Sequence, residues 1–207
     1  MPIESATEHW QRTWSEKAVD EVSWFEATPA SSLAMIEELS LPPEAAIIDL
    51  GGGASGLAGE LLAHGYTQIT VADISAAALE KAKARLGDRA AGIEWVVADA
   101  RSHDFGRQFD LWHDRAVFHF MVDEADRRGY VETLKRSVAP GGHLIVATFG
   151  PAGPSRCSGL PVANYDAPEL ANALAPAAEL VSSHLEAHVT PSGNTQQFLY
   201  AHLDAKT

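Results

Sequence analysis

Short apolar runs alternate with amphipathic segments through the middle of the chain. Apolar runs that end at turn residues are typical of buried strands, whereas apolar residues spaced three and four apart predict helices packed on a sheet. The predicted strands are 45–50, 68–72, 93–98, 109–113 and 143–149. The predicted helices between them are 57–64, 76–86 and 126–138. This alternation indicates an α/β fold, a doubly wound and mostly parallel sheet with helices on both faces, which makes a three-layer sandwich.

The two ends of the chain differ from this middle. Residues 1–43 are polar and helical in pattern, and three of the five tryptophans lie within the first 24 residues. Residues 151–207 begin with a loop rich in proline and glycine, and continue with a short helix and two alternating segments around a turn at 191–194. Two such segments predict an antiparallel hairpin at the sheet edge. We therefore predict a single domain, 1–207, in which the core occupies 44–150.

Composition narrows the class of protein. No apolar run approaches the roughly 20 residues that cross a bilayer, and Met1–Ser5 lack the pattern of a signal peptide, so we expect a cytoplasmic protein. The single cysteine, Cys157, excludes an intrachain disulfide, and we predict no metal site. The net charge is −13, with 15 basic residues scattered among 28 acidic ones, which disfavours nucleic acid and anionic membranes as partners. A small molecule is the expected partner, and the oligomeric state stays open.

A glycine-rich turn, Asp49–Gly56, directly follows the first predicted strand. In a doubly wound sheet, ligands bind at the carboxyl ends of the strands, where glycine lets them approach the backbone closely. Gly51, Gly53 and Gly56 fit the GxGxxG pattern of dinucleotide-binding domains. Asp73, at the end of the second predicted strand, suits the ribose of either a dinucleotide or another nucleoside cofactor. The turn therefore predicts a nucleoside cofactor without saying which one.

Two further features separate these alternatives. Asp99 ends the third predicted strand, and Pro140–Gly142 precede the fifth. Together with the acidic residue and glycines of the turn and with Asp73, they form an ordered set that resembles the class I S-adenosylmethionine-dependent methyltransferases over residues 44–150. A nicotinamide-dependent oxidoreductase and a non-catalytic cofactor-binding module are the alternatives from other classes.

The resemblance implies a seven-stranded sheet in the order 3-2-1-4-5-7-6, with S-adenosylmethionine as cofactor and S-adenosylhomocysteine as product. Carried over by position, it implies that the cofactor-binding residues of the core are Asp49, Gly51, Gly52, Gly53, Asp73, Ile74, Asp99 and Ala100. One departure is Ser55, which stands where the family has its third glycine. Asp73 and Asp99 each have a simpler alternative as caps of the helices that follow.

The N-terminal segment is similar to a narrower group. Its passages Trp10–Trp14 and Val22–Glu26, followed by Pro29, resemble the lead-in of thiopurine, thiol and halide methyltransferases. The similarity implies that 1–43 is a lid over the cofactor in which Trp14 and Trp24 contact it, and aromatic faces do attract a sulfonium cation. The alternative is that the tryptophans only pack a helix onto the domain.

The acceptor side is less defined. His113 and His119, near the end of the fourth predicted strand, are candidate general bases, and Arg115 is a candidate to hold an acceptor anion. Each has a structural alternative: a packed histidine, or an ion pair of Arg115 with Asp114 or Asp110.

We expect three further residues to line the acceptor site: Phe25, Phe118 and Cys157. For Cys157 the alternative, a small buried hydrophobe, is the preferred interpretation. Because a thiol ionises near neutrality and needs little help from a base, a small thiol or sulfide is the first predicted acceptor, and an O- or N-methyl acceptor is the alternative.

Overall fold

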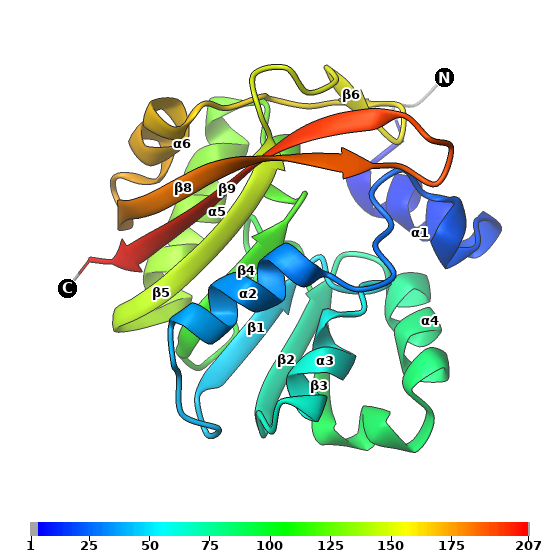
Figure 1. Ribbon diagram of the computed structural model, residues 1–207, viewed down its shortest axis with the longest axis horizontal. Coiled ribbons are helices and arrows are strands. Elements are labelled where there is room, and N and C mark those ends of the chain that lie inside the picture. The colour runs from blue at the N-terminus through cyan, green and yellow to red at the C-terminus, as the bar shows by residue number, and fades with distance from the viewer. Residues whose placement is uncertain (1–3, 207) are drawn as a thin grey trace.

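Seven strands form one twisted sheet through the middle of the molecule (Figure 1). The computed structural model describes residues 4–206, so Met1–Ile3, on which the expectation about a signal peptide partly rests, lie outside it. The parallel strands are β1 (Ala46–Leu50), β2 (Gln68–Asp73), β3 (Ile93–Val97), β4 (Phe109–Arg115) and β5 (Val138–Phe149). The antiparallel strands are β8 (Ala178–Val189) and β9 (Thr195–Ala205). Their order, β3-β2-β1-β4-β5-β9-β8, confirms the predicted topology and hairpin.

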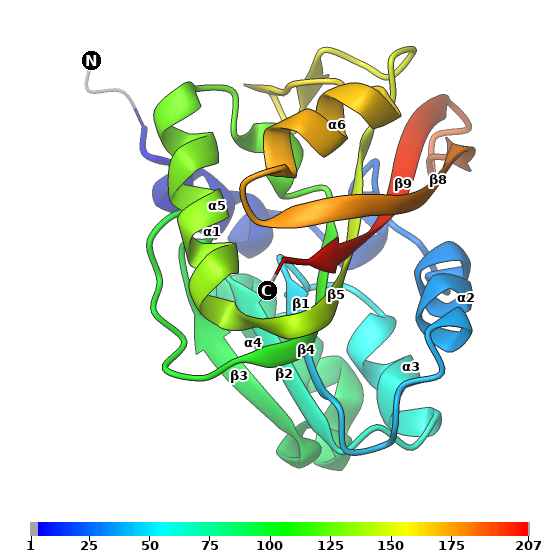
Figure 2. The same cartoon turned by 90° about the vertical axis from the view of Figure 1, so that its left-hand side faces the viewer.

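Helices cover both faces of the sheet, as the apolar strands require. One face carries α2 (Ala30–Glu38), α3 (Leu57–Ala63) and α4 (Ala76–Leu86), and the other carries α5 (Glu124–Ser137) and α6 (Ala167–Leu174). Figure 2 shows α5 and α6 on one side of the sheet and α2 and α3 on the other. The neighbours Ile47 and Ile48 of β1 point to opposite faces and are both fully buried, one in each of the two cores. No helix within residues 4–206 is long and apolar enough to cross a membrane.

The structure changes two local predictions. Strand β5 begins at Val138, earlier than expected, and includes Pro140–Gly142. A register shift in the pairing of β5 with β4 and the positive φ of 75° at Gly141 mark a bulge, which lets the strand continue through the glycines. The loop after β5 contains a small ribbon of β6 (Arg156–Cys157) and β7 (Leu160–Pro161).

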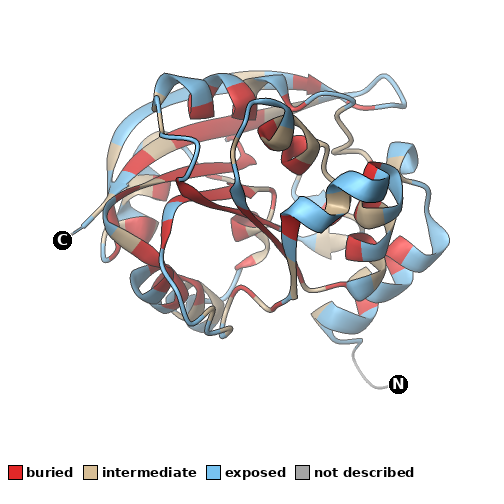
Figure 3. Ribbon diagram, turned by 90° about the horizontal axis from the view of Figure 1, so that it is seen from below, coloured by how far each residue is buried: buried red, intermediate tan, exposed pale blue. Residues whose placement is uncertain are grey.

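The N-terminal helix α1 (Ala6–Glu16) packs against α4 near the carboxyl ends of the strands. Ser5 and Glu8 form a capping box that fixes its first turn. The side-chain oxygen of Gln11 accepts hydrogen bonds from Ser75 Oγ at 3.1 Å and from the Ala77 amide at 3.2 Å. The helix is thereby attached to the first turn of α4. Figure 3 shows the central strands buried and the helices exposed on their outer sides.

A buried polar network holds the end of β4. Trp112 Nε1 donates to Tyr130 Oη at 3.0 Å, and Tyr130 Oη donates to Asp114 Oδ2 at 2.6 Å. The Asp114 carboxylate also accepts from the amides of Val117 and Phe118. Burial raises the pKa of Asp114 to about 6, although these hydrogen bonds act to lower it. The network therefore fixes the turn that leaves β4 and links it to α5.

Replacing Tyr130 by phenylalanine tests this network. The variant removes the hydroxyl that connects Trp112 to Asp114 and leaves both without that buried partner. We expect the free energy of unfolding to fall by about 1–3 kcal/mol, measured by urea denaturation with tryptophan fluorescence. The control is Tyr66→Phe, because Tyr66 is only partly buried and does not belong to this network. Equal effects of the two variants would contradict the role of the network.

Candidate functional site

A cavity of about 280 Å³ opens at the carboxyl ends of β1, β2 and β4. Its walls come from the N-terminal segment, the strand ends with the turns that follow them, and the β6–β7 ribbon. The three acids singled out from the sequence, Asp49, Asp73 and Asp99, all line it. The structure thus brings together side chains from three different strand ends, as the doubly wound fold requires.

Asp49 and the glycine turn shape one end of the cavity. Asp49 Oδ1 lies 2.8 Å from His113 Nδ1, whereas its buried Oδ2 has no hydrogen-bond partner within residues 4–206. A Cβ atom at Gly52 would lie 2.2 Å from Asp49 Oδ2, and one at Gly51, where φ is 68°, would lie 2.2 Å from Val117 Cγ2. Any larger residue would therefore displace the walls of the site. A buried carboxylate oxygen without a partner favours a cationic donor, such as an ammonium group, in the adjoining space.

Asp73 connects the glycine turn to the next helix. Its Oδ2 accepts from the Gly53 amide at 3.1 Å and its Oδ1 from the Ser75 amide at 2.8 Å. The cap of α4 is Ser75, whose Oγ accepts from the Ala78 amide. Burial raises the pKa of Asp73 to about 6, against the opposing effect of the two amides. The carboxylate thus holds the turn and also faces the cavity, where its remaining lone pairs can accept hydroxyl groups.

Asp99 is held by a residue that the sequence analysis did not single out. Arg101 Nη2 donates to Asp99 Oδ2 at 2.6 Å, and Arg101 also reaches Asp126 at 3.2 Å. Burial acts to raise the pKa of Asp99, but the hydrogen bonds and charge of Arg101 outweigh it and hold the pKa below its usual value. Ile74 and Ala100 line the same part of the cavity. This end therefore has a fixed carboxylate beside two apolar side chains.

Aromatic side chains close the cavity from the N-terminal side. Trp14 and Trp24 both line it, as does Phe25, and the two tryptophan rings pack edge to face at 6.0 Å. Trp10, which also lines the cavity, packs in the same way on Trp24 at 5.7 Å and on Phe120 at 5.2 Å. The two interpretations of the tryptophans are thus compatible, because the rings pack on one another and form the wall. Trp10 and Phe120 were not among the predicted site residues.

Arg115 lines the cavity, but its guanidinium is already occupied. Its three nitrogens donate to Tyr200 Oη at 2.9 Å, to the Trp24 carbonyl at 2.9 Å and to Glu26 Oε1 at 2.8 Å. The guanidinium also lies 4.6 Å from the ring centre of Phe198. The side chain therefore ties the N-terminal segment to the sheet. Its ion pair is with Glu26, and the expectation of a pair with Asp114 or Asp110 was wrong.

Glu26 is a cavity residue that the sequence analysis missed. It is partly buried, and its carboxylate lies 3.6 Å from His188 Nδ1 as well as beside Arg115. Burial raises the pKa of Glu26, while the charges of Arg115 and His188 act in the opposite direction. Glu26 ends the Val22–Glu26 passage noted in the sequence, but that resemblance gave it no role, and only the fold shows that it faces the cavity.

The two candidate bases have different surroundings. His113 lines the cavity, but both ring nitrogens are engaged, Nδ1 with Asp49 and Nε2 with Ser32 Oγ at 2.9 Å. His119 is fully buried and does not line the cavity; its Nδ1 accepts from the Phe149 amide at 3.3 Å. Burial lowers the pKa of His119 to about 3, so the ring is neutral at physiological pH. Neither histidine has a free nitrogen directed into the cavity.

Of the other residues predicted to line the acceptor site, Cys157 lines the cavity and Phe118 does not. Phe118 does not line the cavity, because its ring packs between Tyr130 and Tyr165 in the core. Cys157 does line it, at the base of the β6–β7 ribbon, and is buried. Burial raises the pKa of the Cys157 thiol to about 12, which keeps it protonated. The cysteine is thus a small apolar part of the wall.

Comparison with known proteins identifies the domain. Residues 47–142 match the family model described as a methyltransferase domain. Nodulation protein S of Rhizobium tropici is 35% identical over 106 residues, which are 51% of this chain and 43% of that protein. A malonyl-[acyl-carrier protein] O-methyltransferase of Anoxybacillus flavithermus is 28% identical over 142 residues, 68% of this chain and 52% of that protein. The chain spans about half the length of these curated relatives.

Solved structures extend the likeness to almost the whole chain. A structure from work on the conversion of a disulfide bond into a thioacetal group during echinomycin biosynthesis has a TM-score of 0.79 at 20% identity, covering 97% of this chain and 93% of that one. The N-methyltransferase NodS from Bradyrhizobium japonicum, in complex with S-adenosylhomocysteine, has a TM-score of 0.69 at 19% identity, covering 95% and 98%. The chain has the fold of these methyltransferase structures, and residues 47–142 are the part that matches the methyltransferase domain model. The predicted fold is confirmed, and the domain match and the neighbours with bound S-adenosylhomocysteine agree with the predicted class and cofactor. The narrower similarity of the N-terminus to thiol methyltransferases stays a prediction.

Asp73 provides a test of cofactor binding that depends on pH. An ionised carboxylate accepts hydroxyl hydrogen bonds, and it loses this capacity when it is protonated. We expect the affinity for S-adenosylhomocysteine to fall as the pH drops through about 6, the raised pKa of Asp73. Asp73→Asn should lose about 1–3 kcal/mol of binding free energy at neutral pH and show no such step.

Isothermal calorimetry across this pH range measures both effects. The control is Asp88→Asn, an exposed aspartate that does not line the cavity. If Asp73→Asn bound S-adenosylhomocysteine as tightly as the native chain, the role of Asp73 would be confined to the glycine turn.

Proposed function

We propose that this protein transfers the methyl group of S-adenosylmethionine to a small molecule held under the N-terminal segment. The observation that carries the proposal is the buried, unpartnered Asp49 Oδ2 beside the glycine turn. The ammonium of the methionine moiety supplies the cationic donor that this oxygen lacks. Glycines at positions 51 and 52 keep Val117 and Asp49 in place at the cavity wall, because a Cβ atom at either position would collide with one of them.

The rest of the cavity fits the remaining parts of this cofactor. Asp73 accepts the ribose hydroxyls, and Asp99 faces the adenine with Ile74 and Ala100 against the ring. Trp14 and Trp24 present aromatic faces that attract the sulfonium. The cofactor supplies an activated methyl group, so the residues of this chain need only orient the acceptor, exclude water and accommodate a proton.

The nature of the walls limits the acceptor. The closing surfaces are largely apolar, because Phe25, Phe120, Leu160 and Pro161 line the cavity on this side. The N-terminal segment is held by Arg115, whose three guanidinium nitrogens each donate to a protein group and whose charge is paired with Glu26, so this arginine is a poor partner for a strongly anionic acceptor. We infer a small acceptor with an apolar body, enclosed by the lid during transfer.

A small thiol or sulfide is our first candidate for the nucleophile. Neither His113 nor His119 offers a free ring nitrogen to the cavity, and a thiol needs little base assistance, since it ionises near neutrality. The structural neighbour from echinomycin biosynthesis belongs to a pathway step at a disulfide. These observations support sulfur as the acceptor atom without a dedicated base.

A small amine is the second candidate, because of Glu26. Its carboxylate lines the cavity with a pKa raised by burial, so it can hold an ammonium group and take its proton. Two neighbours are N-methyltransferases by name, NodS and the 1,6-didemethyltoxoflavin N1-methyltransferase of Burkholderia thailandensis, the latter with a TM-score of 0.69 at 19% identity, covering 100% of this chain and 93% of that one. For this chain, the two candidates differ in their dependence on Glu26.

An acceptor screen with Glu26→Gln separates them. The full-length protein is incubated with S-adenosylmethionine and hydrosulfide, methanethiol, aromatic thiols or small amines, and S-adenosylhomocysteine is quantified. We expect turnover of thiols that Glu26→Gln leaves within a few-fold, because no base is required. If only amines react and Glu26→Gln lowers their kcat by about 100-fold or more, the sulfur proposal is wrong and the amine proposal holds. The matched control is Glu44→Gln, an exposed glutamate remote from the cavity.

The lid can be tested independently through Arg115→Lys. Lysine keeps the charge but cannot donate in three fixed directions to Tyr200, Trp24 and Glu26 at once. We expect faster hydrogen exchange in residues 22–28 and an affinity for S-adenosylhomocysteine lower by about tenfold, the scale of one hydrogen bond to a charged group. Arg128→Lys is the control, because Arg128 is exposed on α5. Unchanged exchange in Arg115→Lys would show that other contacts hold the lid.

A further inference from the structure

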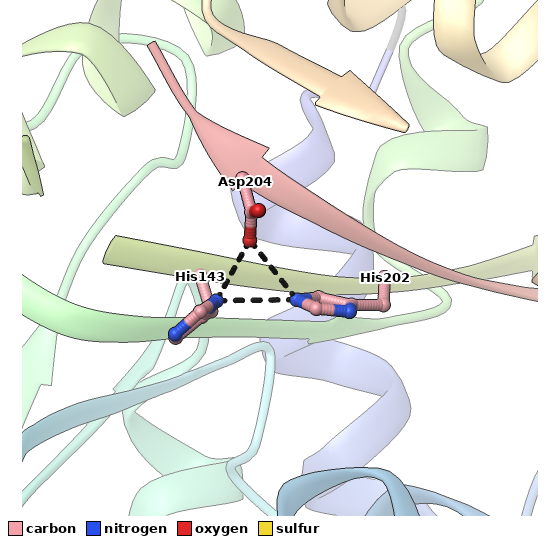
Figure 4. A group of neighbouring side chains, drawn as sticks. All are labelled: His143, His202 and Asp204. Atoms are coloured by element: carbon pink, nitrogen blue, oxygen red, sulfur yellow. Dashed lines mark hydrogen bonds and ion pairs between the residues drawn. The ribbon is translucent and has the colours of Figure 1, made fainter. Parts of the chain in front are cut away.

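Three side chains that could ligate a metal ion meet on the sheet, away from the cavity. His143 of β5 lies opposite Asp204 of β9 in the antiparallel ladder, and His202 lies two positions before Asp204. Residues two apart on a strand point to the same face, so all three side chains project from one face of the sheet. Figure 4 shows them pointing toward one another. None of the three lines the cofactor cavity.

The distances among their polar atoms match those of a metal coordination shell. His143 Nδ1 lies 3.2 Å from His202 Nε2 and 2.9 Å from Asp204 Oδ1, and His202 Nε2 lies 3.3 Å from Asp204 Oδ1. Metal–ligand bonds of about 2.0–2.1 Å separate neighbouring ligand atoms by roughly 3.3 Å in a tetrahedron and roughly 3.0 Å in an octahedron. The three atoms therefore already form one face of such a polyhedron.

Hydrogen bonding alone explains this triangle less well. Both ring nitrogens face one carboxylate oxygen, which can only accept, and they also face each other at 3.2 Å. If both nitrogens carry protons, two donors are brought together; if one lacks its proton, that nitrogen's lone pair faces the carboxylate. A cation at the centre accepts lone pairs from all three atoms and removes this conflict.

The donor set selects the kind of ion. Two imidazoles and one carboxylate, without a thiolate, suit Zn²⁺ and neighbouring divalent transition metals, whereas Mg²⁺ and Ca²⁺ prefer oxygen ligands alone. The Asp204 side chain is 51% exposed and that of His143 27%, so an ion can enter from solvent and water can complete its shell. The sequence analysis predicted no metal site, because residue 143 and residues 202–204 are far apart in the chain and form no motif.

We propose that His143, His202 and Asp204 form a Zn²⁺-class site that joins β9 to β5. The ion cross-links the last strand of the chain to the central sheet and thereby stabilises the C-terminal hairpin. The role is structural: the three ligands lie toward the amino end of β5, whereas the cavity lies at the carboxyl ends of β1, β2 and β4.

Metal titration of the full-length, untagged protein tests the proposal. After chelator treatment and dialysis, Zn²⁺ is titrated against the chain in competition with a chromophoric chelator. We expect one ion per chain, and an affinity at least about tenfold weaker in His143→Gln and in His202→Gln. His64→Gln is the matched control, since His64 is an exposed histidine 3.0 Å from the carboxylate of Glu37 and should leave the affinity unchanged.

Thermal unfolding provides a second measurement of zinc binding, which does not depend on enzyme activity. A ligand that binds only the folded chain raises the melting temperature, so Zn²⁺ should stabilise the native chain and His64→Gln but not His143→Gln or His202→Gln. Mg²⁺ should have no effect at the same concentration. Absence of zinc binding at millimolar concentration, or equal binding and stabilisation in the two ligand variants, would overturn the proposal. Cofactor binding in all variants, measured with S-adenosylhomocysteine, reports separately on the fold and on the proposed function.

Discussion

The hydrogen bond between Asp49 and His113 is the interaction on which the site depends. The two residues lie side by side in the parallel pairing of β1 with β4, and the other nitrogen of His113 binds Ser32 of α2. Asp49 Oδ1 is thus held by His113 of β4, which is itself held by α2. Asp49 Oδ2, at the glycine turn, has no hydrogen-bond partner among the described residues. A buried polar atom without a hydrogen-bond partner is costly, and a cationic donor in the cavity would relieve that cost. If the proposed cofactor binds here, its binding and the stability of the fold are linked at Asp49.

A second set of contacts connects the cavity to its cover. Arg115 leaves β4 just beyond His113 and joins β9 through Tyr200 to the N-terminal segment through Trp24 and Glu26. Strand β4, whose end lines the cavity, thus also holds the N-terminal segment in place through Arg115. In this arrangement each of the three guanidinium nitrogens of Arg115 has a partner, and Glu26 lies in the cavity wall as one of those partners. The position of the N-terminal segment over the cavity thus depends on contacts with the sheet beneath it.

Much of the fold and of the cofactor site follows from local patterns. The strands of the central sheet are buried on both faces, so they appear in the sequence as short apolar runs between helices. Asp49, Asp73 and Asp99 were identified because each stands at or next to the end of such a run, and carboxyl ends of parallel strands meet at one edge. The bulge at Gly141 was not predicted, since a proline and two glycines usually end a strand rather than continue it.

The sequence by itself determined the order of the elements, the resemblance to methyltransferases and the three acids that line the cavity, because these are properties of neighbouring residues and of their spacing. Only the tertiary structure decided which side chains face the cavity from distant segments. Arg115 and Glu26 are 89 residues apart, and His143 and Asp204 are 61 apart, so no local pattern records either pair. His119 lies four residues beyond Arg115 and yet is buried behind the cavity. The direction of a side chain after a strand end depends on the turn, and here the buried network around Asp114 sets that turn.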